Sequence, residues 1–227
     1  MRTRILVTVL ATFIGAVSAH AGLINGGFET GDLTGWTTFT TANGTLGAAG
    51  GGVVLFDTNG DGAAGNSARF RVGELRYTHP IFEGGGIYQD VTLGVGALVV
   101  SAEIASWTPW GNWDGGLFEL LFDGSVVDSH DFGPILIESV EHASLLASFD
   151  VTAGAHEVRL RMTRPWREGD TSPLQFVDNV SLRGAALDNV SLAEPEPPTE
   201  QMPEPGSITL LGLGLLGLAR ARRRRRP

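Results

Sequence analysis

The chain has 227 residues, enough for one or two domains, and it contains no cysteine, which excludes a disulfide framework. Its formal net charge is −9, and all 16 basic residues are arginines, eight of which lie within the first four and last eight residues. Residues 22–203 therefore hold 8 Arg against 24 Asp and Glu, a formal charge of −16. A surface this acidic argues against nucleic acid as a partner and is typical of an extracellular protein.

Residues 1–21 are predicted to be a secretory signal peptide. Two arginines near the N-terminus precede an apolar run, Ile5–Ala19, and Ala19-His20-Ala21 fits the small-x-small pattern of a cleavage site. Cleavage after Ala19 fits nearly as well as cleavage after Ala21. The segment predicts export from a bacterial cytoplasm, and it is excluded from the folded domain.

Residues 22–192 are predicted to form one all-β domain. Apolar and polar residues alternate in several runs, which indicates strands with one buried face, at 68–72, 98–104 and 157–162. Turn signals separate these runs, at 84–86, 123–125 and 153–155. Short strands at such spacing, with no amphipathic helix longer than two turns, predict a jelly-roll-like β-sandwich.

A first candidate calcium site is the acidic turn Asp57-Thr58-Asn59-Gly60-Asp61-Gly62. Asp57, Asn59 and Asp61 place oxygens at alternate positions, as in the first half of a calcium-binding loop. Position twelve of such a loop is Ala68 rather than Glu, so an EF-hand is excluded. The alternative interpretation is a solvated turn between two strands.

Tryptophans concentrate in one short stretch that also contains Pro and Gly. Trp107, Trp110 and Trp113 lie within seven residues, and exposed indoles offer flat faces on which sugar rings stack. The alternative is that these rings cap one end of the sandwich as part of its core.

A basic segment, 161–167, stands out in this acidic domain and contains Arg164 and Trp166. Together with the tryptophans it predicts a site for polysaccharide, and its arginines suit an anionic one. The alternative is that its arginines pair with nearby Glu and Asp.

The predicted last strand, 174–182, contains an acidic residue in an apolar context. Asp178 has the same parity as Phe176 and Val180, so an unbulged strand turns its carboxylate toward the core, whereas a bulge turns it outward. A buried carboxylate is costly unless it is paired. The motif Asp-Asn-Val-Ser-Leu occurs at 178–182 and again at 188–192, so either copy is a candidate for the closing strand.

The two ends of this domain resemble those of jelly-roll carbohydrate-binding modules of the galactose-binding-like group. Residues 23–29, Leu-Ile-Asn-Gly-Gly-Phe-Glu, precede Trp36 and resemble the opening segment, and 174–182 resemble the closing strand. Residues 86–93 resemble the central strand. The resemblance implies a structural calcium ion bound by Glu29 and Asp178, with backbone carbonyls completing six to eight oxygens. The alternative is that Asp178 bonds backbone N–H groups or an arginine.

A linker and a tail complete the chain. Residues 193–202 are too rich in Pro and Glu to fold. Residues 203–227 then hold Pro203-Glu204-Pro205, the apolar run 208–219 and an arginine cluster. A helix from Pro205 to Arg220 extends roughly 22 Å, which spans a thinned bilayer when the arginines reach the cytoplasmic headgroups.

This order of segments resembles the PEP-CTERM sorting signal, in which a Pro-Glu-Pro motif precedes an apolar stretch and an Arg cluster. The resemblance implies transient insertion into the inner membrane and processing by the membrane protease exosortase, with Pro203, Glu204 and Pro205 as the sorting residues. The alternative is a plain tail anchor. The predicted destination is the cell envelope, cell surface or extracellular matrix.

Taken together, the sequence predicts a non-catalytic, polysaccharide-binding surface or matrix protein. The histidines of the domain lack the spacing of metal ligands, and no Gly-x-Ser-x-Gly motif is present, so no enzyme is expected. A purely structural surface protein and, less favoured, a glycan-acting enzyme are the alternatives. Exposed tryptophans favour binding, buried ones favour a structural role, and an acidic pair in a deep cleft favours an enzyme.

Overall fold

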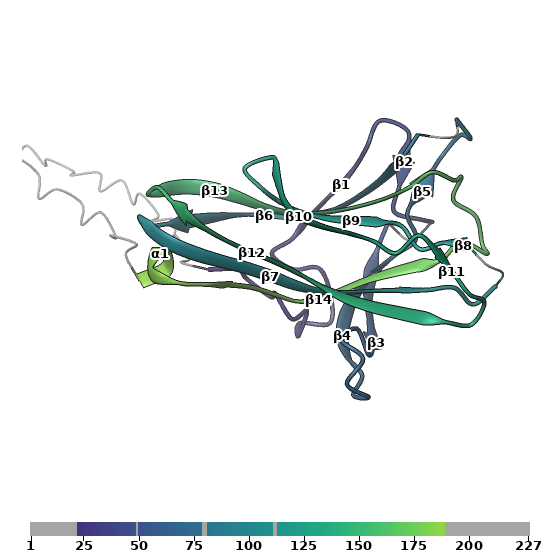
Figure 1. Ribbon diagram of the computed structural model, residues 1–227, viewed down its shortest axis with the longest axis horizontal. Coiled ribbons are helices and arrows are strands. Elements are labelled where there is room, and N and C mark those ends of the chain that lie inside the picture. The colour runs from purple at the N-terminus through teal and green to yellow at the C-terminus, as the bar shows by residue number, and fades with distance from the viewer. Residues whose placement is uncertain (1–21, 49, 79–80, 111–112, 189–227) are drawn as a thin grey trace, which may run out of the picture. The chain divides into compact units, whose positions relative to one another are not determined.

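Two five-stranded antiparallel sheets pack face to face in the computed structural model, which describes residues 22–48, 50–78, 81–110 and 113–188 (Figure 1). The first sheet has the strand order β1 (Thr37–Thr40), β6 (Glu83–Leu93), β13 (Gly154–Arg164), β9 (Leu117–Phe122) and β10 (Ser125–Asp131). The second sheet has the order β12 (Val140–Val151), β7 (Gly96–Trp107), β14 (Leu174–Arg183), β4 (Gly65–Phe70) and β3 (Gly52–Phe56).

Smaller elements lie at the ends of these sheets. Two short ribbons pair β2 (Gly44–Thr45) with β5 (Gly73–Glu74), and β8 (Trp113–Asp114) with β11 (Pro134–Ile135). A single helical turn, α1 (Ala185–Asp188), follows β14 and was not expected from the sequence. In Figure 1, α1 lies at one end of the sandwich, and β8 and β11 lie at the other.

The path of the chain between the sheets confirms the predicted fold class. After β4 the chain crosses repeatedly, with β6, β9, β10 and β13 in the first sheet and β7, β12 and β14 in the second. The strand pairs of both sheets are antiparallel. The domain is therefore a jelly-roll-like β-sandwich.

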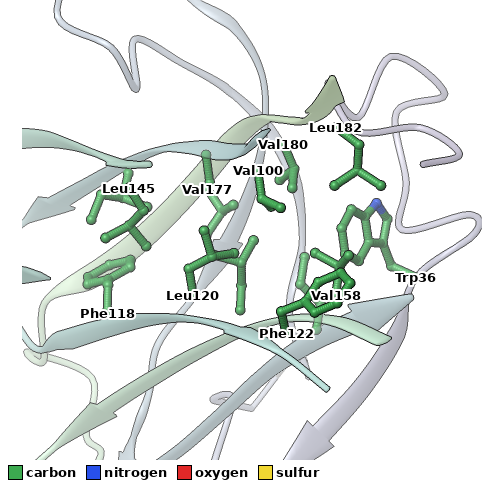
Figure 2. Close-up of a cluster of buried hydrophobic side chains, with 14 of the residues drawn as sticks. Trp36, Val100, Phe118, Leu120, Phe122, Leu145, Val158, Val177, Val180 and Leu182 are labelled. Atoms are coloured by element: carbon green, nitrogen blue, oxygen red, sulfur yellow. The ribbon is translucent and has the colours of Figure 1, made fainter. Parts of the chain in front are cut away.

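The core lies between the sheets, where the apolar positions of the alternating runs meet (Figure 2). Those positions in β4, β7 and β13 are almost completely inaccessible to solvent, namely Ala68, Phe70, Leu98, Val100, Ala102, Ile104, Val158, Leu160 and Met162. Trp36 and Phe28, from the segment before β1, join this core, with ring centroids 6.0 Å apart. Period-two alternation was therefore a sound guide to the buried faces of these strands.

A bulge in β14 changes the direction of Asp178. The register between β14 and β7 shifts between Asp178 and Ser181, and Asn179 has a positive φ of 48°. Val177 and Val180 consequently both enter the core. Asp178 lies opposite Glu103, whose neighbours in β7 point inward, so Asp178 belongs to the outer face of the second sheet. The inward direction expected of an unbulged strand is thus wrong, and the bulged alternative is right.

The signal segment 1–21, the linker 193–202 and the tail 203–227 lie outside the described residues. The first copy of the repeated motif, 178–182, forms the end of β14, whereas nearly all of the second copy lies outside the described part. No helix within the described ranges is long and apolar enough to cross a membrane.

Candidate functional site

Loops at the β8–β11 end of the sandwich surround a hollow of about 160 Å³. Its lining combines three aromatic rings with two arginines and small polar residues, and includes Tyr77, Trp113, Arg164, Trp166, Arg167 and Ser172. Ligand pockets for drug-sized molecules are larger, about 300–1,000 Å³. The hollow is therefore smaller than such a pocket and has room for a small group only.

The aromatic rings around this end are partly open to solvent. Tyr77, Trp113 and Trp166 are 56%, 40% and 37% exposed, and Trp110, in the loop after β7, is 62% exposed. The Tyr77 and Trp166 rings are nearly parallel, with an interplanar angle of 20° and centroids 5.8 Å apart. Tyr77 and Trp166 therefore each cover part of one face of the other, and the exposed remainder of the rings is apolar surface available for stacking.

Short backbone pairing holds Tyr77 beside Trp166. The Glu74 amide donates to the Trp166 carbonyl and the Glu168 amide donates to the Glu74 carbonyl, both at 2.9 Å. The carboxylate of Glu74, which is fully buried, accepts hydrogen bonds from the backbone amide and the hydroxyl of Thr78. The turn that carries Tyr77 is therefore fixed against the segment that carries Trp166.

Sequence reasoning missed Tyr77 because it lies 89 residues before Trp166 in the printed sequence. No local pattern marks it, and only the long-range pairing of β5 brings it to the site. The predicted tryptophan cluster is divided in space: Trp113 lines the hollow, Trp110 lies exposed beyond β7, and Trp107 is half-buried opposite Leu174.

Arg164 forms one wall of the hollow from inside the protein. It ends β13 with the inward parity of Leu160 and Met162, and only 1% of it is exposed. Its Nε donates to the Asp114 carbonyl at 2.9 Å and its Nη1 donates to the Val72 carbonyl at 3.1 Å. Burial lowers the pKa of the guanidinium to about 10, which leaves it charged at neutral pH.

The arginines of the basic segment differ in their partners. Arg161 pairs with Glu119 at 2.6 Å on the outer face of the first sheet, as the alternative interpretation expected. The carboxylates of Asp114 and Glu168 influence Arg164, yet among the described residues none lies within 4.0 Å of its guanidinium nitrogens. Arg167 is exposed at the rim of the hollow.

The structure brings Glu29 and Asp178 together beneath the N-terminal segment. Asp178 is 8% exposed, and burial, with help from the charges of Glu29 and Glu103, raises its pKa to about 6 despite a 2.6 Å hydrogen bond from the Asn179 amide. Asn66 donates from its side chain to Glu29 at 3.3 Å. Gly27 and Gly65 leave room beside these groups: a Cβ there would lie 3.6 Å from Glu29 Oε1 and 3.5 Å from Asp178 Oδ2.

The chemical type of these groups suits calcium, since two carboxylates and the amide oxygens beside them are hard oxygen ligands. Within the described part of the chain, no group of three or more His, Asp or Glu side chains could hold a metal ion. Carbonyls, side-chain amides and water would have to complete the shell.

The acidic turn between β3 and β4 uses its oxygens internally. Asp57 accepts from the Gly60 and Gly62 amides at 2.8 and 2.9 Å, Asn59 accepts from the Asp61 amide at 3.1 Å, and Asp61 accepts from the Ala63 amide at 2.8 Å. This arrangement stabilises the turn, and it does not require an ion.

Comparisons with known proteins address the tail and the fold. Residues 203–225 match the model of the PEP-CTERM protein-sorting motif. The chain therefore carries this sorting signal, which implies export and confirms that prediction. No curated protein sequence matches the chain.

Several solved structures are similar to the domain. They include TmCBM61 in complex with β-1,4-galactotriose, at 15% identity, TM-score 0.43, and coverage of 72% of this chain and 98% of that chain. The CBM22-1 xylan-binding domain from Paenibacillus barcinonensis Xyn10C has 11% identity, TM-score 0.41, and coverage of 72% and 94%. Arabinose-bound MgGH51 α-L-arabinofuranosidase has 13% identity, TM-score 0.44, and coverage of 72% and 26%. Identities and TM-scores this low do not transfer a ligand or an activity to this chain.

Proposed function

We propose that this exported protein binds polysaccharide without cleaving it and acts at the cell envelope, the cell surface or in the extracellular matrix. The observation that carries the proposal is the hollow at the β8–β11 end, where Tyr77, Trp113 and Trp166 are partly exposed around it. Exposed rings are costly unless something covers them. A sugar ring stacked on an indole covers its face and keeps its own hydroxyls in water.

The charged residues of the hollow support binding rather than catalysis. Cleavage of a glycosidic bond generally needs two carboxyl groups that flank the bond. Among the described residues that line the hollow, Arg164 and Arg167 carry charge and none is Asp or Glu.

The proposal is tested by measuring retention of the secreted protein on a glycan array and on insoluble polysaccharides. Trp166→Ala and Trp113→Ala should each weaken retention about tenfold or more, as expected for the loss of one stacking ring. A matched control is Trp107→Ala, because Trp107 does not line the hollow. Absence of retention on every glycan, or equal retention by all three variants, contradicts the proposal.

We also propose that exosortase removes the arginine cluster after the Pro203-Glu204-Pro205 motif. The match at residues 203–225 supports this step. Mass spectrometry of the native secreted protein should find a C-terminus near residues 203–207. Recovery of the secreted form with Arg226 intact contradicts it.

We propose a structural calcium ion at Glu29 and Asp178, supported by their proximity and by the burial of Asp178. For the second candidate, Asp57, Asn59 and Asp61, the oxygens already accept amide hydrogen bonds, so calcium there is the weaker proposal.

A further inference from the structure

We infer that the hollow selects polysaccharides that carry an oxyanion, a uronate carboxylate or a sulfate ester, next to the sugar ring that stacks on the aromatic residues. This inference rests on the proposed function and adds the chemical class of its ligand. Arg167, which is exposed at the rim, is the residue that would contact the oxyanion, and the buried guanidinium of Arg164 would attract it from within the wall of the hollow.

Arg164 is a buried cation without a carboxylate partner among the described residues. A guanidinium that is 1% exposed has lost nearly all of its hydration, and the hydrogen bonds that the structure records for it go to two neutral carbonyls. Carbonyl dipoles compensate a buried cation only in part. An oxyanion in the hollow would supply the countercharge, whereas a neutral sugar would not.

The arginines of the domain differ in whether a carboxylate neutralises them. Arg159 pairs with Glu157 at 2.8 Å and Arg161 pairs with Glu119 at 2.6 Å, both on the outer face of the first sheet. At the hollow, Arg164 and Arg167 make no ion pair that the structure records among its described residues. Arg69, Arg76 and Arg183 also make no recorded ion pair, but Arg76 and Arg183 are exposed and Arg69 is half-buried, so Arg164 is the one fully buried arginine among the described residues. Arg164 and Arg167 together place positive charge where the rings are exposed.

A second hollow lies close to the first. It encloses about 190 Å³ and is lined by Leu46, Gly47, Arg69, Phe70, Arg71 and Leu174, among others. The segment 169–174 contributes to both hollows, since Gly169 and Ser172 line the first, Leu174 lines the second, and Asp170 lies 4.0 Å from Arg71. Asp170 is fully exposed and so neutralises Arg71 weakly, and the Nε of Arg71 is buried without a hydrogen-bond partner.

The guanidinium group explains why the ligand class is an oxyanion. Its planar fork of N–H donors matches carboxylate and sulfate oxygens with two parallel hydrogen bonds. A polymer with a charge on successive units would place one group at Arg164 and Arg167 and another at Arg69 and Arg71. The rest of the acidic domain repels such a polymer, so binding has to be local and to need the rings as well as the arginines.

The test compares charged and neutral glycans of the same backbone. Polygalacturonate is set against its carboxyl-reduced form, and dextran sulfate against dextran, with the secreted protein and affinity measured by calorimetry. Arg167→Gln should lower affinity for at least one charged member about tenfold, the loss of a charge-assisted hydrogen bond, and leave the neutral member unchanged. The two pairs distinguish a carboxylate from a sulfate as the source of the oxyanion.

Arg183→Gln is the matched control. It removes the same charge from an exposed residue at the far end of β14, about 30 Å from Leu174 along the strand. Equal affinity for charged and neutral members, with Trp166→Ala still weakening both, overturns the inference and leaves the proposed function standing. Binding of duplex DNA as tightly as of the charged glycans, indifferent to Trp166→Ala, also overturns it. Absence of binding to any glycan contradicts both the inference and the proposed function.

Discussion

The two regions that contain Arg164 and Asp178 present the same physical problem with opposite signs. Arg164 is a buried cation at the hollow, and Asp178 is a buried anion on the outer face of the second sheet. Burial shifts both pKa values toward the neutral form, to about 10 and to about 6. Neither charge has an ion-pair partner among the described residues, whereas Arg161 and Glu119 satisfy each other on the first sheet.

A buried charge without a countercharge can indicate the charge of a ligand. An isolated buried charge is expensive, and a chain with no need for it would carry an apolar residue of similar size instead. At the hollow the missing charge is negative, which suits an oxyanion on a glycan. At Asp178 and Glu29 the missing charge is positive, which suits calcium.

The largest effect is expected from truncating Arg164. Arg164→Ala should lower the free energy of unfolding by about 3 kcal/mol or more, because it leaves a cavity and two carbonyls without donors. Arg161→Ala should lower it by less than about 1 kcal/mol, because its ion pair with Glu119 is partly solvated. Denaturant unfolding of both variants measures the difference. Equal losses of unfolding free energy would mean that Arg164 contributes no more to stability than the partly solvated Arg161. That result would contradict the description of Arg164 as a buried cation.

The second-largest effect is expected from Asp178→Asn, which should change stability in opposite directions with and without calcium. In a chelator, Asp178→Asn should stabilise the domain by about 1–3 kcal/mol at pH 7, because it removes a buried charge. In excess calcium the same variant should be less stable than the wild type, because an ion bound only by the folded state adds RT ln(1 + [L]/Kd). Melting temperatures in both conditions check this.

Asp61→Asn is the control for the second candidate site. If the turn between β3 and β4 holds no ion, this variant responds to calcium like the wild type. A wild-type melting curve that is the same in calcium and in chelator contradicts both calcium sites.

A smaller effect is expected in the pH dependence of the calcium-free domain. The pKa of Asp178 is raised from an ordinary 3.8 to about 6, so between about pH 4 and pH 6 the folded state binds more protons than the unfolded state. Stability should therefore fall as pH rises through this window, by no more than about 3 kcal/mol. Other carboxylates titrate there too, so the quantity to measure is the difference between wild type and Asp178→Asn. A difference that is flat from pH 4 to pH 7 contradicts the raised pKa.

The sequence predicted the architecture better than the site. Alternation in β4, β7 and β13 correctly marked their buried faces, because the period of a strand depends only on local backbone geometry. The same alternation misplaced Asp178, because the bulge at Asn179 gives the two parts of β14 opposite inward parities: Val177 faces the core before it and Val180 after it, so Asp178 does not share the face of Val180.

Only some of the residues that line the hollow could be predicted from the sequence. Trp113, Arg164 and Trp166 were found from local density of rings and charge, while Tyr77 depends on pairing between β5 and the segment after β13. The inward direction of Arg164 follows from its parity with Leu160 and Met162. Its lack of a carboxylate partner, however, depends on which loops meet at the end of the sandwich, and no spacing in the sequence records that.

The smallest effect is expected from Trp110, and it separates a binding surface from a core more sharply than the larger ones. Trp110 is 62% exposed, so Trp110→Ala removes a ring that leaves no cavity and should change the free energy of unfolding by less than about 0.5 kcal/mol. Trp36→Ala, which truncates a core ring that packs on Phe28, should cost about 3–5 kcal/mol. If Trp110→Ala also weakens glycan retention, the surface of the hollow extends to the loop after β7. A loss of stability close to that of Trp36→Ala, with glycan retention unchanged, would instead make Trp110 a structural cap and confine binding to Tyr77, Trp113 and Trp166.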